Sequence, residues 1–392
     1  MLAGILGPHQ PARPHATAPD VSFAANKMAL HGTNPWAIEG LPGLSQISPP
    51  PFDLSYSMIP SGVPSGSLAV VGLRIFYIVD QRRVESTVVG WSRQPDVLAT
   101  APPCHSINQI AAAGHVVAYV ESWPIGIPFE ATGCGSPTSM AWTVQFMDLA
   151  GSSPRIVAAG VTSGGAGRTG LAPVHLGLSD SVYAFERSDA DATLPGIIEV
   201  HSVDDGSLLL RTRSDEPVAE LLVGGTTLAV LEASAGTRTS DYRLQVADLG
   251  DPELRTVADR TSAAAISQDG SYLAWDAGGG GAGTGVAMQN LASGQTEVVP
   301  ALSASSTAGP LNPAVSSTSR GPIVAWLATA TGGAVYPAFR TLANGSGTAI
   351  ASVQVTAWVS LQGSVLIWAA AAGDGSLGVA YALDLATAQT GP

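Results

Sequence analysis

Lysine is almost absent from this chain of 392 residues: Lys27 is the only one, against 16 arginines. Charged residues make up only 12% of the sequence, about half the usual share. The net charge is −13, and no cluster of basic residues offsets it, so we expect no nucleic-acid partner. The sequence also lacks an apolar run of about 18 residues, so we predict no transmembrane helix.

Cysteine is scarce too, and Cys104 and Cys134 are the only two. Two cysteines alone make neither a zinc site nor a disulfide framework. Residues 1–6 lack a basic region and are followed by Gly7 and Pro8, so they do not read as a signal peptide. The low charge and the abundance of Ser, Thr, Gly and Ala nevertheless favour an extracellular, periplasmic or cell-envelope protein. Three readings of the N-terminus stay open: an export signal was removed, the start is misassigned, or the protein stays inside the cell.

What the sequence has in abundance is Gly (45) and Pro (28), which suits many short strands joined by turns. Seven segments share one pattern: a turn residue, two variable positions, an aliphatic residue, usually Ala, and then an aromatic residue or a residue such as Val. They are residues 65–70, 114–119, 180–185, 225–230, 270–275, 321–326 and 363–368. We interpret each as the second strand of a repeated unit.

The clearest copy of the unit lies at residues 264–299. One strand is followed by a turn at Asp269 and Gly270, a second strand that ends at Trp275 and Asp276, and two more short strands. Four antiparallel strands in about 40 residues are typical of one β-propeller blade. The sequence therefore predicts an all-β propeller, with seven four-stranded blades by count. Six or eight blades stay open because the first blade is weakly marked.

A second marker supports the repeat. The third strand of several units ends in Asp or Asn followed by Leu and a turn, or in a close variant of this pattern. The instances are residues 146–151, 246–250, 290–294, 341–345 and 384–387. Asp, Asn and Gly accept the positive φ values that tight hairpins need. Both markers are structural, so neither predicts a catalytic role.

The segment from Ser267 to Trp275 resembles the Ser-Pro-Asp-Gly-x-x-Leu-Ala-Phe/Trp signature of TolB-like and related WD-like propellers. Gln268 replaces the proline, and the other units, over residues 52–388, match in pattern only. The resemblance implies the propeller fold. Propellers of this kind include periplasmic interaction scaffolds, peptidase-gating domains and hydrolases of sugars or lactones, so the function stays open.

Two regions follow from the repeat: a flexible tail at residues 1–50 and the propeller at residues 51–392. The last unit has no room for a good fourth strand, because few residues follow 378–385. An open ring would expose an unpaired strand edge. We therefore expect an N-terminal strand from residues 20–50 to close the ring, or a strand exchanged with a neighbouring molecule.

Long insertions are predicted to gather on one face of the ring, which we call the loop-bearing face. There the connections between second and third strands meet those between blades. The insertions are residues 122–140, 161–173, 188–195, 233–241, 277–284 and 303–313. Rigid scaffolds present binding loops in this way. Cys104 and Cys134 both map to this face, so we predict a disulfide that pins the longest insertion, with free thiols as the alternative.

Acidic residues recur at the loop-bearing ends of the second strands, and further ones follow in the connection after residue 187. These candidate binding residues are Glu121, Glu186, Asp189, Asp191, Glu232 and Asp276. A ring of carboxylates would bind Ca²⁺ or a cationic ligand. Period-two alternation, however, points Glu121 and Glu232 to one side and Glu186 and Asp276 to the other. Solvated strand-end carboxylates are therefore favoured, and we expect no cofactor, with Ca²⁺ kept as an alternative.

Nucleophilic catalysis has little support, since no Gly-x-Ser-x-Gly elbow precedes a helix. His105, His115, His175 and His201 are candidates for acid–base work, but the sequence shows no partner for them. We expect a non-enzymatic protein that binds a protein or glycan partner through the loop-bearing face. One alternative is a structural subunit of a fibre or coat, self-associating through the N-terminal segment. The other is a propeller hydrolase that uses carboxylates or Ca²⁺.

Overall fold

The computed structural model describes residues 45–46, 55–58, 68–90, 94–125, 139–151, 153–163, 174–187, 196–233, 241–277, 285–300, 312–329, 335–341, 348–349, 356–371 and 377–388. The predicted tail lies outside these residues, apart from 45–46. The described residues form the strands β1 to β29 and one short helix, α1 (Leu385–Ala388). No helix in these ranges has the length and apolar character needed to cross a membrane.

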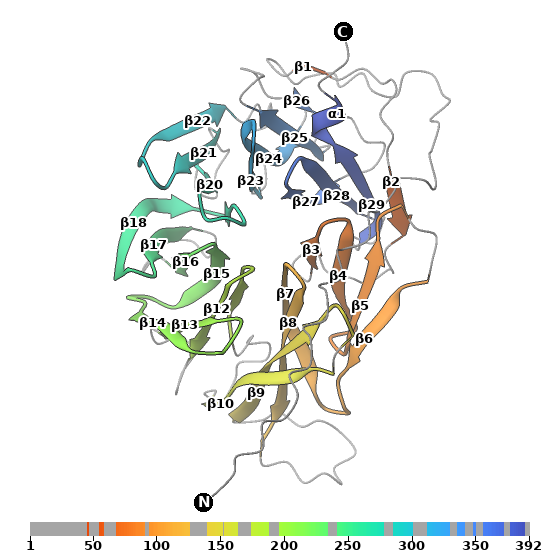
Figure 1. The fold of residues 1–392 in the computed structure, drawn as a ribbon, viewed down its shortest axis with the longest axis vertical. Helices are drawn as coiled ribbons and strands as arrows, with labels where there is room; N and C mark the ends of the chain where they lie inside the picture. Colours follow the sequence, from red (N-terminus) through yellow and green to blue (C-terminus); the bar gives the residue numbers. More distant parts are fainter. Residues whose placement is uncertain are drawn as a thin grey trace, which may run out of the picture.

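The strands form seven mainly antiparallel sheets arranged around a common centre (Figure 1), which confirms the predicted seven-bladed β-propeller. Blade 1 consists of β3 (Leu68–Val71), β4 (Arg74–Val79), β5 (Arg83–Val88) and β6 (Asp96–Thr100). Blade 2 consists of β7 (Ser106–Ala113), β8 (Val116–Pro124), β9 (Ser139–Asp148) and β10 (Arg155–Ser163). Blade 3 consists of β11 (Leu176–Leu178), β12 (Val182–Arg187), β13 (Ile197–Ser202) and β14 (Leu208–Arg213).

Blade 4 consists of β15 (Val218–Gly224), β16 (Thr227–Ala233), β17 (Tyr242–Asp248) and β18 (Asp251–Thr261). Blade 5 consists of β19 (Ala264–Ile266), β20 (Tyr272–Asp276), β21 (Gly285–Asn290) and β22 (Thr296–Pro300). Blade 6 consists of β23 (Ala314–Thr318), β24 (Gly321–Thr329), β25 (Val335–Thr341) and β26 (Thr348–Ala349), with β1 (Ser45–Gln46) parallel to β26. Blade 7 consists of β27 (Thr356–Gln362), β28 (Val365–Ala371), β29 (Leu377–Asp384) and β2 (Ser55–Met58).

Each blade begins at the centre of the ring and runs outward. Its first strand contacts the first strands of both neighbouring blades, so β3, β7, β11, β15, β19, β23 and β27 surround the axis. We call these the inner strands. The second strand of each blade ends at the loop-bearing face, where the chain also crosses from one blade to the next.

The hydrophobic core lies between the blades, because each sheet buries both of its faces against its neighbours. Trp142 packs at the boundary of blades 2 and 3, Trp326 at that of blades 5 and 6, and Trp368 at that of blades 6 and 7. Trp275 packs against Leu231 and other residues of blade 4, so it is a packing residue between blades 4 and 5. Two-sided burial also explains why the second strands read as almost continuous apolar runs.

Six of the seven predicted second strands are confirmed, but the first is wrong. Residues 65–70 lead into β3, the inner strand of blade 1, and the second strand is β4. The true equivalent is residues 72–77, in which Gly72 has a φ of 57° and Tyr77 takes the aromatic position. The error arises because β3 and β4 carry the same short aliphatic pattern, and each is preceded by a glycine.

The ring closes within the chain. Strand β2 pairs antiparallel with β29, and Tyr56 lies opposite Tyr381 in the register. The closing strand comes from residues 55–58 of the same chain, so the prediction that it lies within residues 20–50 is wrong. A closing strand is needed because the chain turns into α1 directly after β29, which leaves the outer edge of that strand to be paired.

Candidate functional site

The structure places the four predicted carboxylates that it describes at the loop-bearing ends of second strands. Glu121, Glu186, Glu232 and Asp276 are only 9%, 8%, 0% and 1% exposed, so the prediction that they are solvated is wrong. Adjacent blades cover the strand ends, which periodicity within one blade cannot reveal. Asp189, Asp191 and Cys134 lie outside the described residues, and their roles stay predictions.

Alternation does separate these carboxylates, as predicted. Val120 packs in the core between blades 2 and 3, so its neighbour Glu121 points toward blade 1. Leu231 packs toward blade 5, so Glu232 points toward blade 3, whereas Glu186 and Asp276 point toward the following blade. The four groups therefore form no common ring.

Two of the four carboxylates have separate local partners. The hydroxyl of Ser262 donates to Asp276 over 2.6 Å, and Arg243 forms an ion pair of 2.6 Å with Glu232. Among the residues that the structure describes, no group of three His, Cys, Asp or Glu side chains is placed to hold a metal ion. Ca²⁺ binding stays an untested prediction.

Glu121 belongs to a hydrogen-bonded chain between blades 1 and 2. Its Oε1 lies 2.5 Å from Nδ1 of His105, and its Oε2 accepts a bond of 2.5 Å from the amide of Gln145. The hydroxyl of Tyr119 donates in turn to Gln145 over 3.0 Å. Burial and the nearby charge of Glu121 raise the pKa of Tyr119 to about 12, so this hydroxyl keeps its proton. The chain fixes the position of Glu121 and, through it, of His105.

His105 stacks on Trp123, and we call this pair the His105–Trp123 platform. The ring centroids are 4.8 Å apart and the planes differ by 10°. The side chain of His105 is 25% exposed, and Trp123 is half-buried, so the platform is accessible on the loop-bearing face. Cys104 precedes it with a φ of 65°, a strained value for a residue with a side chain.

A second polar group lies nearer the axis of the ring. Nε2 of His175 is 3.6 Å from Oε2 of Glu186, and Nδ1 of His175 is 3.4 Å from the amide of Gln109. Burial lowers the pKa of His175 to about 4 and raises the pKa of Glu186 to about 7. Between these pH values both side chains are neutral, so the pair is not an ion pair there.

The structure pairs three of the four candidate histidines with glutamates. The third pair is His201 with Glu199, 3.4 Å apart on β13, where Arg211 also bonds to Glu199. Glu199 and His201 are two residues apart on one strand, so both side chains lie on the same face of the sheet, and this pairing could have been predicted from the sequence. The pairing of His105 with Glu121 could not have been predicted in this way, because it depends on the register between β7 and β8, in which Ile107 lies opposite Glu121.

His115 lies apart from these groups. It lines a cavity of about 220 Å³ between blades 2 and 3, together with Phe146, Asp148, Arg155 and Asp204. This cavity opens at the turn that joins β7 to β8, which is the end of the ring opposite the loop-bearing face. His115 therefore serves as a reference position on the opposite face.

No known protein family matches the sequence, and no curated protein matches it. Solved structures do match. The propeller domain of the trilobed protease from Pyrococcus furiosus, described as having an open velcro topology, is 7% identical over 82% of this chain and 95% of that chain, with a TM-score of 0.51. A prolyl endopeptidase is 12% identical over 86% of this chain and 48% of its own, with a TM-score of 0.50.

TolB from Acinetobacter baumannii is 14% identical over 82% of this chain and 65% of its own, with a TM-score of 0.42. The chain is a β-propeller. The predicted resemblance is confirmed at the level of the β-propeller fold, which the propeller domain of the trilobed protease shares, and identities this low show the fold alone. The chain spans about two thirds of the TolB chain and about half of the endopeptidase chain.

Proposed function

We propose that this propeller is a non-enzymatic binding protein that holds a protein or glycan partner on its loop-bearing face. The observation that carries the proposal is the His105–Trp123 platform. Its two stacked rings are accessible to solvent, and His105 is held in place by the hydrogen bonds that run through Glu121, Gln145 and Tyr119. Aromatic side chains dominate binding energy where they are rigid and can be desolvated by a partner.

The platform suits both partner classes that the sequence predicts. Because the indole and the imidazole are stacked, a partner meets an outer ring face or the ring edges, and such surfaces pack against the apolar face of a sugar ring or an aromatic side chain of a peptide. Because the rings are already held in place, binding loses little side-chain entropy. The long connections predicted on the same face supply further contact area.

The test compares two aromatic positions on opposite faces. Immobilised protein is screened against a glycan array and a displayed peptide library, and the binders are then measured with Trp123→Ala and His115→Ala. We expect Trp123→Ala to weaken binding by about 2 kcal/mol or more, a hot-spot value, and His115→Ala to leave it unchanged. Equal affinity for both variants and the wild type, with unchanged circular dichroism, would remove the loop-bearing face as the binding surface.

We also propose that the protein acts outside the cytoplasm, in the periplasm, the cell envelope or the extracellular space. The proposal is supported by the composition and by the predicted disulfide between Cys104 and Cys134. Cys104 lies in the exposed turn before β7, beside the platform. A disulfide at this place would be stable in an oxidising compartment.

A hydrolase is the second candidate, and the His105–Glu121 pair favours it. A carboxylate on Nδ1 directs the lone pair of Nε2 outward, as a general base requires. Assay against panels of glycoside, ester and peptide substrates tests this candidate. Turnover that is lost in His105→Gln and kept in His115→Gln would establish it over the binding role.

A further inference from the structure

The cavity of about 220 Å³ between blades 2 and 3 lies on the face of the ring opposite the platform, and we call it the blade 2–3 cavity. Its apolar wall consists of Val116, Phe146 and Val203, which are all buried. The volume is below the roughly 300–1,000 Å³ of pockets that hold drug-sized ligands. The cavity therefore suits a small molecule with a short carbon skeleton.

Charged side chains of both signs line the same cavity. Arg155 comes from the start of β10, Asp148 from the end of β9, and Asp204 from the turn after β13. On the outer strand of blade 3, Arg211 forms an ion pair with Glu199. Arg155, in contrast, forms no ion pair with any carboxylate of the residues that the structure describes. The cavity thus keeps a positive group apart from negative ones, and a ligand can bridge them.

Two contacts hold the guanidinium of Arg155 at the wall of the cavity. Its Nη2 donates to the backbone carbonyl of Val203 in blade 3 over 3.0 Å, and its Cζ lies 5.5 Å from the centroid of the Phe146 ring. A guanidinium has five N–H donors, and within the described ranges the bond to Val203 is the only hydrogen bond that this one forms. The remaining donors can bind a carboxylate in the bidentate geometry that a guanidinium favours.

Asp204 supplies the negative group. Its neighbour Asp205 holds the turn by accepting two hydrogen bonds from Ser207. The carboxylate of Asp204 itself forms no hydrogen bond or ion pair with the part of the chain that the structure describes. That of Asp148, in contrast, accepts the amide of Ala150 over 2.8 Å. Asp204 is therefore the carboxylate that can take a positive group of a ligand.

We propose that the blade 2–3 cavity binds a small zwitterion, a free α-amino acid with an aliphatic side chain. Arg155 binds its carboxylate, Asp204 binds its ammonium group, and the apolar wall packs against its side chain. A simple anion would meet two carboxylates, and a simple cation would meet the guanidinium, so a ligand with both charges fits this lining best. His115 completes the lining, and such a ligand does not require it. The site is independent of the proposed function, because it lies on the opposite face.

Ligand-observed NMR titration of the full chain at pH 7 tests the inference with three probes. They are L-leucine, L-leucinamide, which lacks the carboxylate, and N-acetyl-L-leucine, which lacks the ammonium group. We expect L-leucine to bind with a dissociation constant of about 1 mM or tighter, and each derivative to bind about tenfold more weakly, the value of one charge-assisted bond. Arg155→Gln should remove the preference over L-leucinamide, and Asp204→Asn should remove the preference over N-acetyl-L-leucine.

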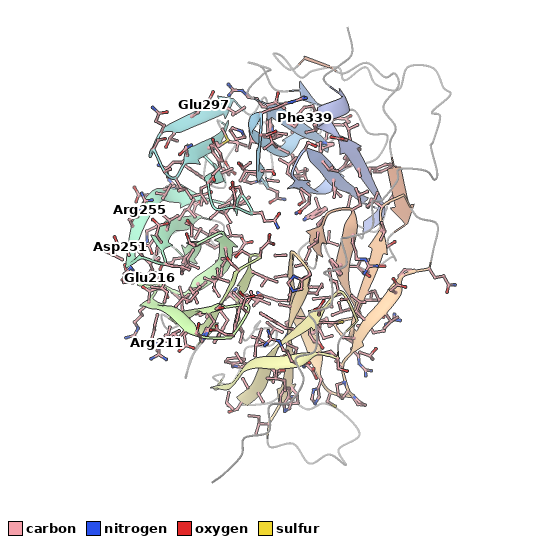
Figure 2. The ribbon with its side chains drawn as sticks, in the orientation of Figure 1. Arg211, Glu216, Asp251, Arg255, Glu297 and Phe339 are labelled. Atoms are coloured by element: carbon pink, nitrogen blue, oxygen red, sulfur yellow. The ribbon has the colours of Figure 1, made fainter. Side chains whose placement is uncertain are left out.

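Two matched variants serve as controls. Asp251→Asn and Arg255→Gln remove the same charges from β18 at the rim of blade 4, where Figure 2 shows both residues, and should leave all three affinities unchanged. Thermal midpoints check the folding of every variant. Asp204 is exposed, so Asp204→Asn should fold and keeps the test decisive even where Arg155→Gln lowers the midpoint.

Three results would overturn the inference. They are the absence of saturable binding of L-leucine, equal binding of the three probes, and a preference for L-leucine over N-acetyl-L-leucine that survives in Asp204→Asn. Each leaves the proposed function intact, since partner binding on the loop-bearing face is measured separately with Trp123→Ala.

Discussion

At the scale of single residues, this propeller buries carboxyl groups at the ends of its second strands and gives them unequal support. Glu232 has Arg243, and Asp276 has the hydroxyl of Ser262. Among the residues that the structure describes, Glu186 has only the uncharged ring of His175, 3.6 Å away, as a partner for its carboxyl group. Burial without a compensating charge therefore dominates at Glu186, and it raises the pKa of this group to about 7.

This shift predicts a pH-dependent effect of Glu186→Gln. The pKa of Glu186 is about 7 in the folded protein against 4.5 for an ordinary glutamate, so the folded state holds the proton more tightly. The stability that the protonated group contributes is complete below pH 4.5 and is lost as the pH rises through 7. Glutamine cannot ionise, so relative to wild type the variant should gain up to about 3 kcal/mol between pH 4.5 and 8.

Urea unfolding of both proteins at several pH values measures this difference. His175 is present in both proteins, so its opposite contribution, lost as the pH falls from 6.5 toward 4, largely cancels. Glu253→Gln, at an exposed position, serves as the reference and should show no such trend. A Glu186→Gln difference that stays constant with pH would contradict the raised pKa.

The conformation and surroundings of Gly225 predict that a larger residue at this position would destabilise the fold. Gly225 has a φ of 52°, and its amide donates to the carbonyl of Gln268 in the next blade. A Cβ atom there would overlap the backbone carbonyl of Asp269. Gly225→Ala should therefore destabilise the fold by about 2 kcal/mol or more, through strain and overlap together. At Gly250, where a Cβ would meet no atom within 4 Å, alanine should cost little. Thermal unfolding of the two variants gives the comparison.

At the scale of elements, the sequence predicts second strands well and their surroundings poorly. The Asp269–Gly270 turn is the hairpin that the motif indicates: Gly270 has a φ of 74°, and the Asp269 carboxylate accepts bonds from Ser267 and Ser271. Such turns are local, so a short pattern suffices to find them. The pairing of His105 with Glu121 depends on strand register and on the blade boundary, and no local pattern contains that information.

The predicted disulfide concerns one element, the long connection after β8. Cys104 precedes His105, and its partner Cys134 lies within that connection. A bond that closes a loop of about 30 residues should stabilise the fold by about 4 kcal/mol. We expect mass spectrometry of the native protein to find no free thiol. Reductant should lower the thermal midpoint of the wild type but not that of Cys104→Ser/Cys134→Ser. Two alkylatable thiols in native protein would refute the pairing and weaken the proposed location.

At the scale of the whole molecule, stability depends on closing the ring. Each blade buries its faces only against its two neighbours, so the core is continuous only when blade 7 meets blade 1. That boundary is packed by Ile75 and Tyr77 of blade 1 against Ile367 of blade 7. Blade 7 in turn is complete only when β2 covers the edge of β29, which ties the N-terminal part of the chain to its C-terminal part.

Two truncations test this dependence. Removing residues 1–44 keeps both β1 and β2, and we expect a protein that unfolds like the full chain. Removing residues 1–58 deletes β2, leaves the backbone of β29 unpaired from Ser55↔Ala382 to Met58↔Val379, and exposes an edge that can pair with another molecule. The shorter protein should therefore lose thermal stability and self-associate with rising concentration, as measured by light scattering. If the protein without residues 1–58 stays monomeric with an unchanged thermal midpoint, β2 does not hold the ring closed. Packing at the seven blade boundaries must then be sufficient to keep the ring closed.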